Sequence, residues 1–161
     1  MLCILGKVCA HCYRACMKEP ALSFVTTQPE NWPRPKGYSN GIRVPAGRDM
    51  LFLAGQIGWD AAEQMVGDTF LPQFRQALEN IATLVKLAGG EVEDIVRLTV
   101  FCLDTDDYLV DPKAVGQAYR SVMGRHYPVM SLVQVAGLVE TGALLEIEAT
   151  AALLPLDQGD S

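Results

Sequence analysis

The sequence has 161 residues, 50% of them hydrophobic, which is enough for one domain with a sizeable apolar core. Its formal net charge is -6 and no block of Lys or Arg occurs, which argues against a protein that binds the phosphate backbone of nucleic acids. No apolar run approaches the ~20 residues of a membrane-spanning helix, so we expect a cytoplasmic protein with no membrane partner.

Residues 1–22 differ in composition from the rest, because they contain four of the five cysteines. Thiolate and imidazole ligands suit zinc, but a structural zinc site normally has a second, separated pair of ligands, which is missing here. The residues in question are Cys9, His11, Cys12 and Cys16. A signal peptide is the weaker alternative, since charged residues interrupt the short apolar stretch. We interpret residues 1–22 as an N-terminal extension without a metal, or as untranslated if synthesis begins at Met17, and residues 23–161 as the domain.

The first part of the domain contains several prolines, which deny backbone donors and restrict the residue before them. Residues 24–37 are therefore expected to form an extended arm. Residues 41–44 and 50–54 then predict two short strands across the turn at residues 45–49. Their length and turn chemistry favour a hairpin.

The clearest predicted helix follows a loop after Asp60. Asp68 or Thr69 can cap its start, and Gly89 with Gly90 ends it, because glycine takes the left-handed conformation at low cost. Apolar residues recur at the spacing of one buried helix face. They are Phe70, Phe74, Leu78, Ile81 and Val85.

A strand is predicted over residues 95–103, followed by a short acidic loop at residues 104–107. Asp111 and Pro112 then begin a second helix, which Gly124 ends. Its inward residues are expected to be Val115, Ala118 or Tyr119, and Val122.

Two further strands are predicted at residues 127–137 and 144–151, where apolar residues alternate. Side chains two apart share a face of a strand, so Glu146 and Glu148 point the same way. The whole order predicts an α+β domain, in which two helices pack on one face of a mixed sheet. The other face then needs a cover, which copies of the same chain would supply most economically.

Several segments together resemble the RidA family, also called YjgF, over about residues 23–154. The resemblance rests on Gly37-Tyr38-Ser39-Asn40-Gly41, Leu53-Ala54-Gly55-Gln56-Ile57-Gly58, Leu87-Ala88-Gly89-Gly90, residues 94–101, Pro128-Val129-Met130-Ser131 and Leu145-Glu146-Ile147-Glu148. It implies the YjgF-like, chorismate-mutase-like fold and a homotrimer with a small-molecule cleft at each subunit interface. No metal-ligand cluster appears in residues 23–161, and we expect no cofactor.

Members of this family that act as deaminases hydrolyse imines and enamines to a keto acid and ammonia. That reaction needs a guanidinium for the substrate carboxylate and a carboxyl group for water and protons. By resemblance the guanidinium belongs at position 130, where this chain has Met130. Methionine can neither carry charge nor donate a hydrogen bond, so the substrate specificity is expected to differ.

The remaining site positions follow from the resemblance as well. Glu146 is the candidate catalytic residue, and Tyr38 also matches the family. The family's usual Ser and Asn are replaced by Ala54 and Gly116, which together with Met130 make the expected cleft less polar. The predicted substrate-binding residues are Tyr38, Ala54, Gly55, Gly116, Met130 and Ser131.

Two functions stay open at this point. One is a divergent hydrolase of C=N bonds; the other is a trimeric protein that binds a small molecule without turning it over. The structural alternative is that Glu146 or Glu148 only bonds to the backbone, or pairs with Arg97 or Arg125 at the trimer contact. His126 either faces the cleft mouth or is a solvated helix-end residue. RNA cleavage, described for some relatives, conflicts with the acidic charge.

Overall fold

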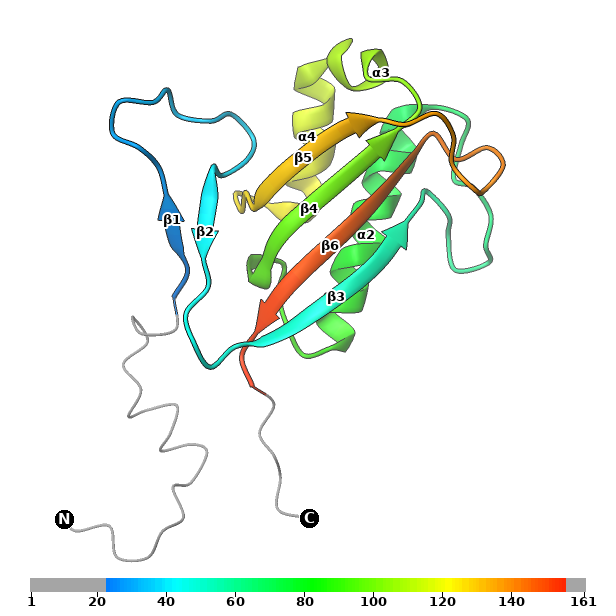
Figure 1. Ribbon diagram of the computed structural model, residues 1–161. Helices are drawn as coiled ribbons and strands as arrows, with labels where there is room; N and C mark the ends of the chain where they lie inside the picture. Colours follow the sequence, from blue (N-terminus) through cyan, green and yellow to red (C-terminus); the bar gives the residue numbers. More distant parts are fainter. Residues whose placement is uncertain (1–22, 156–161) are drawn as a thin grey trace, which may run out of the picture.

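Figure 1 shows the computed structural model of the protein, which describes residues 23–155. A four-stranded sheet in the order β3-β6-β4-β5 forms its centre, and two long helices lie behind it. The elements are β1 (Val25–Thr27), β2 (Gly41–Arg43), β3 (Asp49–Gln56), α2 (Phe70–Leu87), a 3-10 turn (Val92–Asp94), β4 (Ile95–Cys102), α3 (Asp106–Leu109), α4 (Pro112–Met123), β5 (Val129–Gln134) and β6 (Leu145–Leu153). The predicted α+β class is confirmed. The extension predicted for residues 1–22, with its cysteines, lies outside the described residues.

The sheet is mixed, as expected, because β4 and β5 run parallel while β6 is antiparallel to both β3 and β4. On β6 the residues Leu145, Ile147 and Ala149 are buried in the core. Glu146 and Glu148 alternate with them and are half-buried and exposed. The prediction that both glutamates share one face of the strand is therefore confirmed, and that face is the one turned away from the helices.

The long helix α2 buries the five apolar side chains that the periodicity predicts. It begins after Thr69, which has an extended backbone, although the Thr69 side chain makes no capping hydrogen bond. Gly89 ends it at a φ of +84°, a conformation that glycine adopts without strain. These side chains are buried in the core that α2 shares with α4, β3 and β6, and burial contributes about 1.5–3 kcal/mol for each large side chain.

The second helix, α4, starts as predicted, with Asp111 as its cap and Pro112 in its first turn. The Asp111 carboxylate accepts a hydrogen bond from the Ala114 backbone N–H at 2.9 Å. Its fully buried residue near the end is Met123, whereas the predicted Val122 is half-buried against the core. The helix ends at Gly124, whose φ is +60°.

The predicted hairpin between residues 41–44 and 50–54 is wrong. β2 instead pairs with β1 in a separate two-stranded sheet, and β3 pairs along its length with β6 (Figure 1). Between β2 and β3 the proline Pro45 lacks a backbone donor and Gly47 has a φ of +86°, so the chain turns away from β2. β6 offers a longer, alternating apolar partner than the three residues of β2. Part of the predicted acidic loop also forms the short helix α3.

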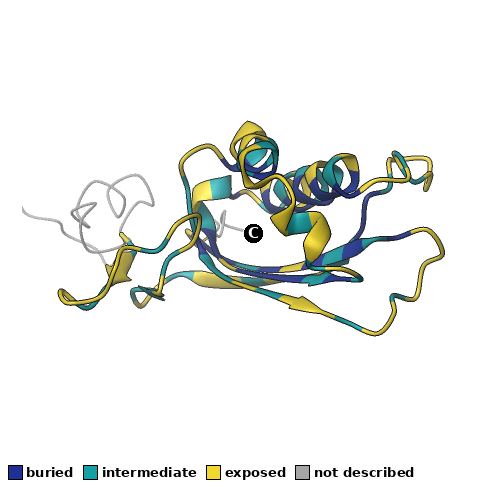
Figure 2. Cartoon of the chain, turned by 90° about the horizontal axis from the view of Figure 1, so that it is seen from above, coloured by how far each residue is buried: buried dark blue, intermediate teal, exposed yellow. Residues whose placement is uncertain are grey.

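Figure 2 shows both long helices on one side of the sheet, while no described element covers the other side. We call this other side the open face. Large hydrophobic side chains are exposed on it, with Phe52 76%, Met50 47% and Val133 44% exposed. Within residues 23–155 no helix has both the length and the apolar character required to cross a bilayer.

Candidate functional site

The carboxylate of Glu146 lies directly against Gly55, on the open face where β6 adjoins β3. A Cβ atom at position 55 would overlap the Glu146 side chain, Oε1 included, so only glycine leaves room for the carboxylate in this position. The register between β3 and β6 shifts between Leu53 and Gln56, which places Ala54 and Gly55 in this irregular segment. Such irregularities bend a strand and redirect its side chains. The structure thus brings Ala54, Gly55 and Glu146 together.

A second group of predicted residues lines a cavity of about 170 Å³ beside β5, which we call the β5-edge cavity. Tyr38, Met130 and Ser131 are among its lining residues, together with Arg97. Because a volume of this size corresponds to roughly six water molecules, the cavity suits a metabolite of a few carbon atoms.

The backbone around Ser39 forms the outer wall of this cavity. The Ser39 N–H donates to the Pro128 carbonyl at 3.0 Å, and the Ser39 hydroxyl donates to the Tyr127 carbonyl at 2.6 Å. Ser39 also forms an isolated parallel bridge with Val129. These contacts hold Tyr38 at the edge of the sheet although it is 91 residues or more away along the chain from β5.

The start of β5 is fixed by α4. The Tyr119 hydroxyl donates to the His126 carbonyl at 2.8 Å, and the rings of Tyr119 and Tyr127 stack at 5.5 Å between centroids. Burial raises the pKa of Tyr119 far above its ordinary value, so its hydroxyl stays protonated and able to donate. The segment that leads to Met130 is therefore held on both sides.

The strand register decides the direction of the site side chains. Met130 lies opposite Leu98, which is buried beneath the helices, and Met130 itself packs against the core. Arg97 and Ser131 lie one residue to either side of this pair and turn to the open face. Met130 and Glu146 are consequently on opposite faces of the sheet, and one subunit does not bring them together.

Gly116 is separate from both groups. It lies in α4, where an added Cβ atom would be 3.0 Å from Nη1 of Arg120. It does not line the β5-edge cavity, nor does it contact Gly55.

The ion pairs predicted as alternatives for the β6 glutamates do not form within the subunit. Among residues 23–155 the ion pairs are Arg48 with Asp94 and Arg75 with Glu79. No three His, Cys, Asp or Glu side chains in this part of the chain are grouped so that they could hold a metal ion.

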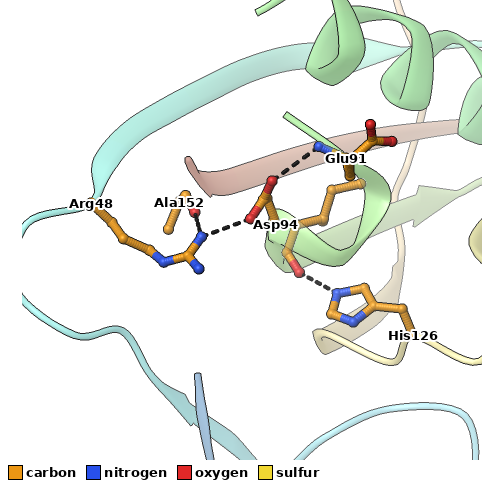
Figure 3. A network of polar contacts seen from close by, with 6 residues as sticks. Arg48, Glu91, Asp94, His126 and Ala152 are labelled. Carbon is orange, nitrogen blue, oxygen red and sulfur yellow. Dashed lines mark hydrogen bonds and ion pairs between the residues drawn. The ribbon is translucent and has the colours of Figure 1, made fainter. Parts of the chain in front are cut away.

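A polar network at the end of the sheet away from Glu146 was not predicted (Figure 3). Arg48 donates to Asp94 and to the Ala152 carbonyl, both at 2.7 Å, and Asp94 accepts from the Glu91 N–H at 3.0 Å. His126 donates through Nε2 to the Ile95 carbonyl at 2.6 Å, which makes it a structural residue of this end of the sheet. The Glu91–Asp94 contact is local, but Arg48 is 46 residues from Asp94 and 104 from Ala152, so no local pattern could reveal its two contacts.

Known proteins resemble this chain in sequence over most of its length. A family model described as "Endoribonuclease L-PSP" matches residues 31–153. A RutC family protein of Pyrococcus horikoshii is 37% identical over 125 residues, which are 76% of this chain and 92% of that protein. The 2-iminobutanoate/2-iminopropanoate deaminase of Salmonella typhimurium is 35% identical over 130 residues, which are 78% of this chain and 95% of that enzyme.

Solved structures agree. A Rid family protein of unknown function from Yersinia pestis has a TM-score of 0.71 at 30% identity, and the match covers 81% of this chain and 98% of that one. The RidA protein of an Antarctic Psychrobacter species has a TM-score of 0.56 at 27% identity, over 80% and 99% of the two chains. With its mixed sheet and its matching sequence over most of its length, the chain belongs to the RidA (YjgF) family.

Proposed function

We propose that the protein is a hydrolase of the imine/enamine deaminase type, whose substrate specificity is altered because Met130 occupies the position of the family guanidinium. The observation that supports the proposal most directly is the contact of the Glu146 carboxylate with Gly55. This contact keeps a carboxylate on the open face, beside the irregular segment of β3. Relatives at 35% and 32% identity are named 2-iminobutanoate/2-iminopropanoate deaminases, which favours the same class of reaction here.

In the proposed reaction Glu146 only accepts and returns a proton. Its carboxylate accepts a proton from a water molecule while the water oxygen attacks the imine carbon, and the former C=N bond becomes a C–N single bond. Glu146 then gives this proton to the nitrogen, and the proton of the new hydroxyl group passes to the nitrogen as well. When the C–N bond breaks, ammonia leaves and a C=O bond remains, so that one imine and one water give one keto acid and one ammonia.

The proposed assembly is a homotrimer with a ligand cleft at each subunit interface. Support comes from the open face, where Phe52, Met50 and Val133 expose apolar surface beside charged and polar residues. A closed ring of identical chains buries such a face without leaving a further edge. Light scattering after gel filtration should give three times the 17.5 kDa mass of the chain. A monomeric mass at micromolar concentration would remove the argument for interface clefts.

A second candidate is a binding protein with the same clefts but without turnover. The observation that favours it is Met130, which packs against the core and offers no charge to a substrate carboxylate. RNA hydrolysis is not proposed, because a chain with a net charge of -6 offers little attraction to a polyanion.

The deciding experiment generates imines in place with an amino-acid oxidase and follows how much imine remains for a chemical trap. Small and bulky amino acids are used in parallel. Turnover that Glu146→Gln abolishes, and that Glu148→Gln leaves intact, supports the hydrolase; Glu148 is the matched control because it lies on the same face of β6 two residues further on. Turnover that survives Glu146→Gln would remove this residue from the mechanism. No turnover with any imine would favour the binding protein.

A further inference from the structure

The arginine that binds the substrate carboxylate in the family is replaced by methionine at position 130, but another arginine lines the β5-edge cavity. We propose that Arg97 binds the substrate carboxylate in this protein, an inference that rests on the proposed function and specifies that its altered substrate is still a carboxylic acid. Two arginines near the site were considered in the sequence, Arg97 and Arg125. The structure separates them clearly.

Arg97 lies next to position 130 on the neighbouring strand, although its side chain turns to the open face and that of Met130 to the core. In the parallel register of β4 and β5, Arg97 is opposite Val129 and Leu98 is opposite Met130. With strands roughly 4.8 Å apart and a rise of about 3.3 Å per residue, the Cα atoms of Arg97 and Met130 are about 6 Å apart. Arg97 also lines the β5-edge cavity together with Met130, Tyr38 and Ser131. Arg125 instead lines a different cavity, with Arg48 and His126.

Within the described part of the same subunit, no residue engages the Arg97 guanidinium. No hydrogen bond or ion pair joins it to any residue between 23 and 155, whereas Arg48 and Arg75 are both engaged with carboxylates. The diagonal neighbour Glu148 is within reach of a long side chain, because Glu148 lies opposite Thr99, two residues after Arg97. The two side chains form no ion pair in the subunit. A guanidinium can present two parallel N–H donors to a carboxylate, which is the geometry this task requires.

Arg97 also shares the open face with the proposed catalytic residue. Glu146 lies opposite Phe101 on the adjacent strand, so its Cα is about 14 Å from that of Arg97. Arg97 lines a second cavity on the open face as well, of about 230 Å³, with Thr99 and Glu148. The guanidinium therefore stands between the β5 edge and the face that carries Glu146.

Calorimetric titration with 2-oxobutanoate tests the proposal, because this stable keto acid has the carboxylate of the imine substrate. The uncharged 2-oxobutanamide is titrated in parallel. We expect Arg97→Gln to weaken 2-oxobutanoate binding by about 10- to 100-fold, the usual effect of losing a charge-assisted hydrogen bond, and to leave the amide unaffected. Arg97→Lys should restore part of the affinity. Arg125→Gln is the matched control, and it should bind as the unmodified protein does.

The outcomes separate this inference from the proposed function. If imine turnover is absent but 2-oxobutanoate binds in an Arg97-dependent way, the hydrolase proposal fails and the assignment of Arg97 stands. If Arg97→Gln keeps the full kcat/KM for the imine and the full affinity for 2-oxobutanoate, the assignment is overturned while the hydrolase stands. Equal losses for acid and amide, a changed oligomeric mass, or no binding of 2-oxobutanoate by the unmodified protein would also overturn it.

Discussion

Gln73 offers the sharpest test of how the fold supports the candidate site. This α2 side chain is fully buried and makes three hydrogen bonds to two loops. Its amide nitrogen donates to the carbonyls of Gly67 and Gly142 at 2.8 and 2.9 Å, and its oxygen accepts from the Leu144 N–H at 2.9 Å. Leu144 immediately precedes β6, the strand that carries Glu146.

We expect Gln73→Met to lower the free energy of unfolding by about 2–4 kcal/mol. Three hydrogen bonds at about 1 kcal/mol each set the centre of this range, and partly buried backbone groups left without a partner raise it. Water at the exposed Gly142 carbonyl limits the loss. Methionine is similar in size to glutamine and leaves little cavity, so the change isolates the polar contribution.

Urea unfolding followed by circular dichroism measures this difference, at one fixed protein concentration because oligomers unfold in a concentration-dependent way. The control is Gln117→Met, since Gln117 is an exposed glutamine of α4 and should change stability by no more than about 0.5 kcal/mol. If both variants lose the same amount, or if Gln73→Met loses less than 0.5 kcal/mol as a rough bound, the reasoning that these hydrogen bonds anchor the loops is refuted.

Three other changes have expected outcomes. Gly55→Ala should lower imine turnover at least 10-fold as a rough estimate, because the new methyl group displaces the carboxylate of Glu146. The free energy of unfolding in urea should change by less than about 1 kcal/mol, because the flexible Glu146 side chain can move aside. Undiminished turnover would show that the position of the Glu146 carboxylate does not matter. Glu63→Gly should raise the free energy of unfolding by about 0.5–1 kcal/mol, since Glu63 has a φ of +58°, and a loss of stability would contradict this account of its strain. Met130→Arg should raise kcat/KM for 2-iminobutanoate and restore it in an Arg97→Gln background; no gain in either would show that the other substituted positions limit the reaction.

The spacing of apolar residues predicted the elements that depend only on neighbouring residues in the sequence. The buried stripe of α2 and the two shared faces of β6 follow from spacing alone, and Asp111 with Pro112 marked the start of α4. The pairing of β2 could not be predicted in this way. A short strand after a turn suits several partners, and the choice depends on β1 and β6, which are distant in the sequence.

The candidate site shows the same division. Glu146 was identified through the family resemblance, but its contact with Gly55 depends on an irregularity in β3 that no residue pattern marks. For Met130, the alternation of side chains along β5 shows which residues share a face, but it does not show which face the helices cover. Its packing against the core, and the place of Arg97 beside it, emerge only from the parallel register with β4.

The central position of β6 affects how the protein is made. Among residues 23–155, β6 is the last strand in chain order, yet it lies between β3 and β4 and bonds to both, with Asp49 paired to Leu153. During synthesis the inner edges of β3 and β4 therefore remain unpaired until the ribosome has released residues 145–153. Such open edges pair readily with other chains. Pairings across so long a stretch of sequence also slow folding. Newly made chains thus pass through an aggregation-prone stage, and their yield should depend on chaperones and on growth temperature more than the stability of the finished fold would indicate.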